Sequence, residues 1–268
     1  MTNQIFLFIC TAHFVITPDA SAETKTYRCV RASSEIKIDG KLDEGAWKAA
    51  EVINNWAYPW YSDGPKQGAK AWLVWDDTYL YMAAWVEDTE LLGSITTTDE
   101  HKVWLDERFE FYLDPNPKDA VYRCWEFTTM KHKLDYGASW GRKFAFDWDS
   151  KGLEYVVVLD GTLNDQQPDK GYWVEARIPF KGNFEKPIGF KARGQRNNPE
   201  APVSFPTFKP PKNIPPKPGD IWHLGINRED QFMKDGKKKY VLMMWADPKV
   251  EKPDFHVPSA FGRMVFTK

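Results

Sequence analysis

The sequence predicts an all-β protein, an antiparallel β-sandwich formed by a single domain. Short apolar and aromatic runs recur along the chain and are separated by turn residues, which is the pattern of a sandwich built from short strands. Aromatic residues make up 15% of the chain and include 13 Trp, and large rings favour pleated, half-buried surfaces. Helical patterns are few, which excludes an all-α fold.

Nine runs have the length and composition of strands. They cover residues 71–75, 79–86, 108–113, 122–128, 154–159, 172–178, 221–228, 240–245 and 262–266. The first two flank a turn sequence at residues 76–78, which predicts a hairpin. One short helix is expected over residues 43–50, where apolar residues recur at helical spacing.

A proline-rich stretch interrupts this pattern at residues 199–218. It cannot form a helix or a central strand, because proline lacks the backbone donor and fixes φ. We expect a long surface excursion between two strands, and the alternative is a peptide-recognition segment. No repeat and no second core are evident, so the sequence predicts one domain over residues 23–268.

The charge balance excludes two classes of partner. The formal net charge is −2, and the two signs are well mixed along the chain. Neither nucleic acid nor a polycation is therefore expected as the partner.

The N-terminus has the pattern of a signal peptide over residues 1–22. A mostly apolar run at residues 5–16 precedes Ala20-Ser21-Ala22, the small-residue pattern that a signal peptidase accepts. Residues 1–4 carry no Lys or Arg, which departs from the usual pattern, and the alternative is a buried N-terminal strand. We expect an exported, soluble protein, periplasmic or extracellular, cleaved near Ala22. Cys29 and Cys124 then remain, either as a disulfide or as two buried thiols.

Five segments occur in the order typical of one family. They are IKIDGKLDEGAW (36–47), VWDDTYLY (74–81), WLDERFEFYLD (104–114), KGYWVEARIPF (170–180), and WADP (245–248) followed by PSAFG (258–262). Together they cover about residues 34–267, and the chain resembles the family 9 carbohydrate-binding modules. The resemblance implies a β-sandwich that binds polysaccharide or oligosaccharide in carbohydrate catabolism. Such modules are often attached to glycoside hydrolases, and some carry structural calcium, for which the sequence assigns no ligands.

The third segment offers a surface suited to sugars. An aromatic ring covers the apolar C–H face of a sugar, while polar side chains satisfy its hydroxyls. Strand alternation directs Phe109, Phe111 and Leu113 to the core, and Glu110 to the opposite face together with Asp106, Arg108 and Tyr112.

The resemblance then implies particular site residues. Trp104 and Glu110 match the positions of a tryptophan and a glutamate that contact sugar. Phe255, beside His256, matches the second ring of the clamp, and Arg228 is a candidate for the polar rim. The alternatives are a ring that caps the sandwich (Trp104), a core ring (Phe255), a surface histidine, and ion pairs for Glu110 and Arg228.

Two other function classes stay open. A glycoside hydrolase would use paired carboxylates, for which Asp106, Glu107 and Glu110 are available. A haem-binding sandwich would need axial ligands such as Met130, Met243 or Met244. Met130 also stands where the family commonly places a sugar-binding Asn. No nucleophile motif and no metal-ligand spacing occurs, so the sequence favours a non-catalytic binding module.

Overall fold

The computed structural model describes residues 24–268 except 97–99, 119–120, 192–194, 196–197 and 199. The expected signal peptide lies outside the described residues. The elements are β1 Thr26–Arg31, α1 Gly45–Ala49, β2 Ala69–Trp75, β3 Tyr79–Glu87, η1 Glu100–Leu105, β4 Arg108–Asp114, β5 Val121–Thr128, β6 Lys133–Ser139, β7 Lys143–Ala145, β8 Glu154–Asp160, β9 Gly171–Pro179, β10 Phe190–Lys191, β11 Val203–Ser204, β12 Ile221–Lys234, β13 Lys237–Met244, η2 Pro258–Ala260 and β14 Gly262–Phe266.

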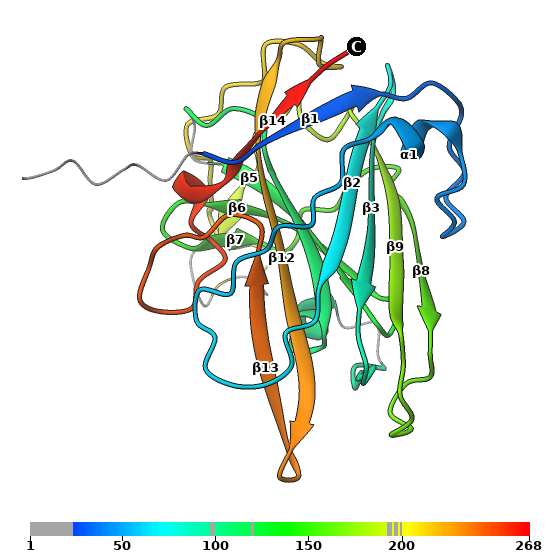
Figure 1. Ribbon diagram of the computed structural model, residues 1–268. Coiled ribbons are helices and arrows are strands. Elements are labelled where there is room, and N and C mark those ends of the chain that lie inside the picture. Colours follow the sequence, from blue (N-terminus) through cyan, green and yellow to red (C-terminus); the bar gives the residue numbers. More distant parts are fainter. Residues whose placement is uncertain (1–23, 97–99, 119–120, 192–194, 196–197, 199) are drawn as a thin grey trace, which may run out of the picture.

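Two layers of strands face each other and are joined by β1 (Figure 1). The strand order is β7-β6-β5-β4-β12-β14-β1-β2-β3-β9-β8, with β13 paired to β12, and β10 with β11 forms a small second sheet. β1 pairs with β14 over its first four residues and with β2 over its last two, both in parallel. The other ladders are antiparallel, so the β-sandwich is confirmed and its sheet is mixed.

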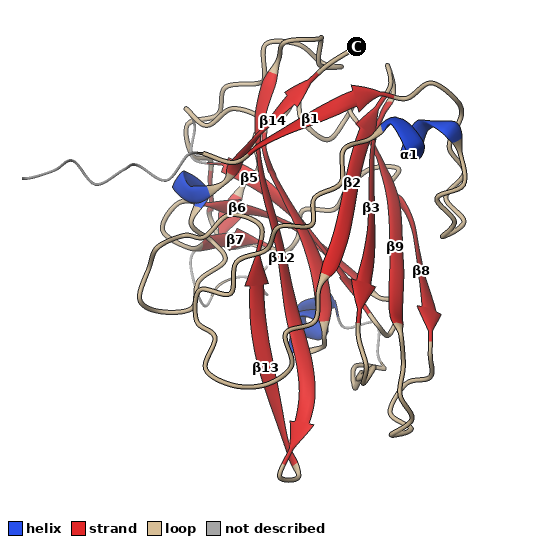
Figure 2. Cartoon of the chain, in the orientation of Figure 1, coloured by secondary structure: helices blue, strands red, loops and turns tan. Residues whose placement is uncertain are grey.

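The secondary structure is almost entirely β, as expected (Figure 2). The nine predicted strands are confirmed, and the helix is confined to Gly45–Ala49. β1, β6 and β7 were missed, together with β10 and β11, which are two residues each. The proline-rich stretch forms only the short β11. Cys29 and Cys124 are buried free thiols, and no helix among the described residues is long and apolar enough to cross a membrane.

The main core lies between the two layers. Phe109, Phe111 and Leu113 of β4 are fully buried there, as strand alternation predicts. Tyr112 instead packs in a second apolar cluster on the opposite face of β4, together with Phe255. That opposite face is therefore also covered, and every residue of β4 is buried.

Gly171 begins β9 at a point where the backbone of β3 leaves no room for a side chain. Its φ is +138°, and a Cβ there would lie 1.9 Å from the carbonyl oxygen of Val86. Gly236, in the turn between β12 and β13, has a φ of +70°, and nothing lies within 4 Å of its Cβ position. The two glycines share left-handed φ and differ in the space around them.

We expect Gly171→Ala to lower the free energy of unfolding by more than about 2 kcal/mol, because left-handed strain of about 1–2 kcal/mol is joined by a backbone clash. Gly236→Ala is the control and should cost about 1 kcal/mol. Urea unfolding of both variants measures the difference. Equal losses would show that β3 and β9 are not packed this closely.

Candidate functional site

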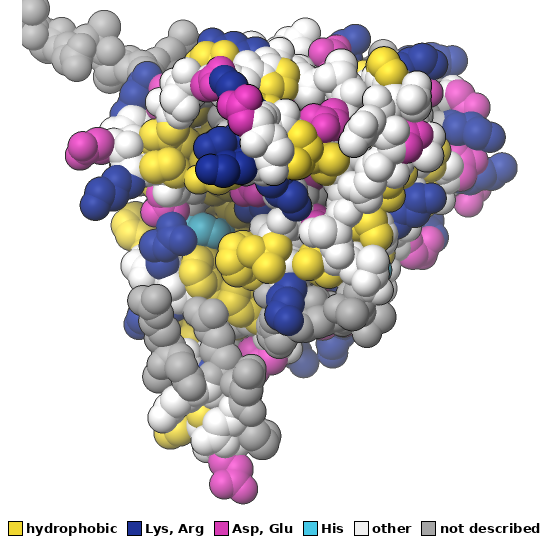
Figure 3. Space-filling model, turned by 90° about the horizontal axis from the view of Figure 1, so that it is seen from below, with side chains coloured by type: hydrophobic (Ala, Val, Ile, Leu, Met, Phe, Trp, Pro, Cys, Tyr) yellow, Lys and Arg dark blue, Asp and Glu magenta, His cyan; other side chains and the backbone are white. Residues whose placement is uncertain are grey.

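A cleft of about 1480 Å³ lies on the side of β4, β5 and β6 that points away from the main core. Its lining comes from η1, from β4–β7, from β10, β11 and residues near them, from the β12–β13 hairpin and from residues 253–256. Figure 3 shows the molecule from below, with Lys and Arg side chains around recessed hydrophobic surface. Trp104 and Phe255, which are distant in sequence, both line this cleft.

The base of the cleft is built on the buried guanidinium of Arg108, which is 8% exposed. Its Nε lies 2.6 Å from Glu110 and 3.2 Å from Glu126, and its Nη1 lies 3.0 Å from Glu229. Nη1 also donates to the carbonyl of Trp104 at 2.7 Å. Arg108 therefore holds the three carboxyl groups around it and fixes the backbone that carries Trp104.

Glu126 is the carboxyl group that faces the cleft from β5. It is 3% exposed, and the Tyr136 hydroxyl donates to its Oε1 at 2.8 Å. Burial and repulsion from Glu110 raise its pKa to about 8, against the attraction of Arg108. Glu126 is therefore largely protonated at neutral pH.

The two predicted aromatic walls differ in exposure. Trp104 on η1 is 47% exposed, so it does not cap the sandwich as a buried ring. Phe255 is only 8% exposed and packs against Trp60 with ring centroids 6.3 Å apart. Phe255 thus lines the cleft while belonging to the second apolar cluster, and it offers a sugar less area than a free ring.

His256 lines the same cleft and is not a surface histidine. Its ring stacks on Tyr112 at 5.1 Å with an interplanar angle of 17°, and it forms a hydrogen bond of 2.9 Å with the Tyr122 hydroxyl. Burial lowers its pKa to about 3. The His256 imidazole is therefore neutral at physiological pH and forms part of the wall of the cleft.

Glu110 does not reach the rim where it was expected. Its side chain is 0% exposed, does not line the cleft, and lies behind Arg108. The prediction placed it on the correct face of β4, but this face is covered by residues around 255 rather than open to solvent. Glu110 acts on the cleft only through Arg108.

The prediction that Arg228 lies at the polar rim of the cleft is wrong, because its side chain is buried and does not line the cleft. It pairs with Phe109 across β12 and β4, so it projects into the space between the layers. Its Nη2 contacts Asp88 at 3.0 Å, Glu107 at 3.4 Å and Asp230 at 3.1 Å, and its Nη1 donates to the Glu87 carbonyl at 2.7 Å. The ion pair with Asp230 was the alternative interpretation.

These three carboxylates are a poor fit for calcium. Asp88, Glu107 and Asp230 offer oxygen atoms within 4.8 Å of one another. Calcium takes six to eight oxygen ligands, whereas the Arg228 guanidinium contacts all three groups. Met243 and Met244, two of the methionines considered as haem ligands, lie in different clusters on opposite faces of β13, so they do not converge on one site.

Sequence reasoning missed a third aromatic wall, formed by Tyr136, Phe144 and Phe146. The Phe144 and Phe146 rings stack at 5.6 Å, and Tyr136 packs on Phe146 at 5.0 Å. All three line the cleft. Their strands were not predicted, so no pattern in the sequence placed them there.

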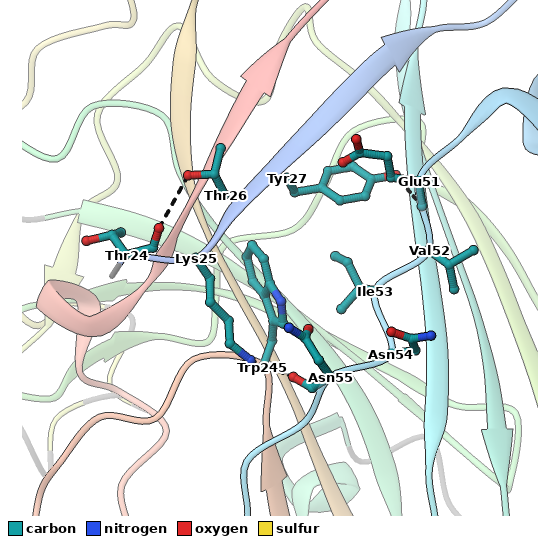
Figure 4. Close-up of a pocket in the computed structure, with 10 residues that line it drawn as sticks. All are labelled: Thr24, Lys25, Thr26, Tyr27, Glu51, Val52, Ile53, Asn54, Asn55 and Trp245. Atoms are coloured by element: carbon teal, nitrogen blue, oxygen red, sulfur yellow. Dashed lines mark hydrogen bonds between the residues drawn. The ribbon is translucent and has the colours of Figure 1, made fainter. Parts of the chain in front are cut away.

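A second hollow of about 450 Å³ lies where β1 begins (Figure 4). Trp245, Lys25 and Asn55 border it, and Lys25 donates to the Asn55 carbonyl. Tyr27 donates to the Leu73 carbonyl at 2.8 Å and accepts from the Leu73 N–H at 2.9 Å. These groups hold β1 against its neighbours.

The comparisons with known proteins point to one family. The family model described as carbohydrate family 9 binding domain-like matches residues 38–268. The chain is 28% identical over 143 residues to exoglucanase XynX of Acetivibrio thermocellus, covering 53% of the chain and 11% of that protein. It is 22% identical over 231 residues to endo-1,4-beta-xylanase A of Thermotoga maritima, covering 86% and 17%. The chain thus spans less than a fifth of either relative.

Two solved structures share the fold. One, from Bacteroides uniformis, has a TM-score of 0.62 at 14% identity and covers 91% of this chain and 99% of its own. The other is a family 9 carbohydrate binding module from Caldicellulosiruptor kristjanssonii in complex with cellotriose. Its TM-score is 0.51 at 20% identity, covering 91% of this chain and 94% of its own.

We expect the stability of the protein to depend on the protonation of Glu126. Its pKa is raised from 4.5 to about 8 on folding, so the folded state binds a proton that the unfolded state releases. This stabilisation is present below about pH 4.5 and is lost as the pH rises to 8, on the order of 2–4 kcal/mol. Glu126→Gln removes this titrating group, so the free energy of unfolding should fall less steeply as the pH rises.

Urea unfolding at pH 5, 6.5 and 8 tests this expectation. Asp230 also has a raised pKa and remains in both proteins, so the comparison is of slopes and not of a flat profile. Glu35→Gln, at an exposed position, is the control and should keep the original slope. If the stability of Glu126→Gln fell with pH as steeply as that of the unaltered protein, the Glu126 carboxyl would not be protonated in the folded protein.

Proposed function

This chain belongs to the carbohydrate family 9 binding domain-like family, and on that premise we propose that it binds oligosaccharide or polysaccharide in the cleft that Trp104 and Phe255 line. One observation carries the proposal: an exposed indole and a buried polar base share one large cleft. Sugar sites need this pairing, because a sugar ring has an apolar face and a polar edge.

Different side chains of the cleft contact different parts of the sugar. Trp104 covers the C–H face of one sugar unit, since nearly half of its surface is open. At the base, the carboxyl groups of Glu126 and Glu229 form hydrogen bonds with sugar hydroxyls. Phe255 and His256 close the opposite side.

Binding is a better account than catalysis. Glycosidases need two carboxyl groups that both reach the scissile bond. Asp106, Glu107 and Glu110, the carboxylates considered for that role, are buried and do not line the cleft. Glu126 and Glu229 do line it, but both are held by the Arg108 guanidinium at 3.2 and 3.0 Å. Asp106 instead accepts from the N–H groups of Ser94 and Ile95. We propose a non-catalytic module that acts with glycoside hydrolases in carbohydrate catabolism, as the names of the two relatives suggest.

We expect Trp104→Ala to weaken sugar binding at least tenfold, about 1.4 kcal/mol, with little change in melting temperature, because the ring is exposed. A glycan array first identifies the ligand, with cellotriose and glucose among the probes. Calorimetric titration and thermal melts then compare Trp104→Ala with Tyr240→Ala, an aromatic that is 59% exposed and does not line the cleft. Equal affinities in the two variants would place the site elsewhere, and an array without any bound glycan would contradict the function.

Export of the protein is also part of the proposal, based on the apolar run and Ala20-Ser21-Ala22. Expression with residues 1–22 intact should yield secreted protein that begins at Glu23 by N-terminal sequencing. A variant with Ala20 and Ala22 changed to Asp should retain the leader. Exported protein that begins at Met1 would contradict cleavage near Ala22.

A further inference from the structure

The cleft is lined by more cationic than carboxyl side chains, whereas the chain as a whole has a slight negative charge. The formal net charge of the chain is −2, yet five cationic side chains and three carboxyl groups line the cleft. The cations are Lys102, Arg108, Arg142, Lys143 and Lys191, and the carboxyls are Glu126, Glu229 and Asp254. A neutral sugar gives no reason for this excess.

Ion pairs compensate part of this positive charge. Glu229 is paired with Arg108 at the base, and Asp254 is paired with Arg142 at the rim. Glu126 has a pKa of about 8 because it is buried next to Glu110, so it carries little charge at neutral pH. Lys191 lies 3.2 Å from Asp147, so the positive charge considered for a ligand is that of Lys143 and of the exposed part of Arg142.

Arg142 is held in place at this rim. It follows Gly141 in the tight turn between β6 and β7, where both residues have left-handed φ values of 60° and 78°. Its guanidinium lies 5.9 Å from the Phe144 ring and donates to Asp254, whose Oδ1 also accepts from the His256 N–H at 2.9 Å. Arg142 thus bridges the β6–β7 turn to the segment that carries Phe255.

Part of this guanidinium remains open to a ligand. The Arg142 side chain is 55% exposed, and arginine has five N–H donors in a planar fork that matches a carboxylate. Lys143, the next residue, is exposed and lines the same cleft. The two adjacent cations occupy the side of the cleft formed by β7.

We propose that the cleft selects a glycan with carboxylate groups, a uronic-acid oligosaccharide, and that Arg142 and Lys143 bind one of these carboxylates. The inference rests on the proposed function, and the sugar ring still stacks on Trp104. The carboxylate of a uronic acid projects from the ring edge, so a stacked ring can direct it toward a charged rim. Specificity for acidic over neutral sugar then comes from the rim, and ring stacking supplies affinity for both.

The test compares one acidic trisaccharide with a neutral partner of the same shape. Calorimetric titration with trigalacturonate and with its methyl ester, at 25 and 150 mM salt, should show at least tenfold tighter binding of the acid at low salt, with the advantage reduced at 150 mM. Arg142→Gln and Lys143→Gln should each lower affinity for the acid about fivefold and leave the ester unchanged. Lys181→Gln, an exposed lysine outside the cleft, is the control.

Each other outcome has a separate meaning. Equal or tighter binding of the ester, or of cellotriose, overturns the acidic-sugar inference and leaves carbohydrate binding intact. Equal binding of a sulfated trisaccharide overturns carboxylate selection in favour of a general anion site. No binding of any of these sugars, or of any glycan on the array, contradicts the proposed function itself. Thermal melts of both variants establish that they fold, and Lys143→Gln leaves the Arg142–Asp254 pair in place.

Discussion

Arg228 links the two layers of the sandwich at one end, and the position of the cleft depends on this contact. From β12 it reaches the Glu87 carbonyl at the end of β3, and it is the cation shared by three buried carboxyl groups, those of Asp88, Glu107 and Asp230. An isolated charge in the interior costs several kcal/mol, so such a group must keep its partners. One of these partners is Glu107, which directly precedes β4. The contact therefore fixes the start of β4, from which Arg108 projects to the other face and holds the Trp104 carbonyl.

The two buried arginines thus occupy opposite faces of neighbouring strands with different consequences. Arg228 lies among backbone carbonyls and carboxylates and is sealed from solvent. Arg108 is in contact with the cleft, and its carboxylates are shared among β4, β5 and β12. One arginine supplies rigidity between layers, and the other supplies a polar base on which a ligand can rest. Removing the first arginine alone would leave its three buried carboxyl groups without a cation, which is strongly destabilising, and removing the second would take hydrogen-bonding groups from the base of the cleft.

The sequence was informative where alternation along a strand decides which residues are buried, and less so where tertiary contacts do. Phe109, Phe111 and Leu113 were placed correctly by their spacing, because period-two alternation is a local property. Glu110 was placed on the right face but at the wrong depth, since the covering segment near Phe255 is distant in sequence. Strand β6 contains Asp135 and Gly137, which weaken strand propensity, so the aromatic wall with Tyr136 gave no signal.

The pairing of β1 with β14 has a mechanical consequence. The strands run in parallel, with Thr26 beside Arg263 and Cys29 beside Phe266, so the chain enters this pair at one end and leaves it at the other (Figure 1). A pulling force applied to the two chain ends would load the hydrogen bonds between β1 and β14 in shear, all together. Unzipping, in which bonds break one after another, would be avoided. The fold is therefore suited to staying intact when tension is applied along the chain.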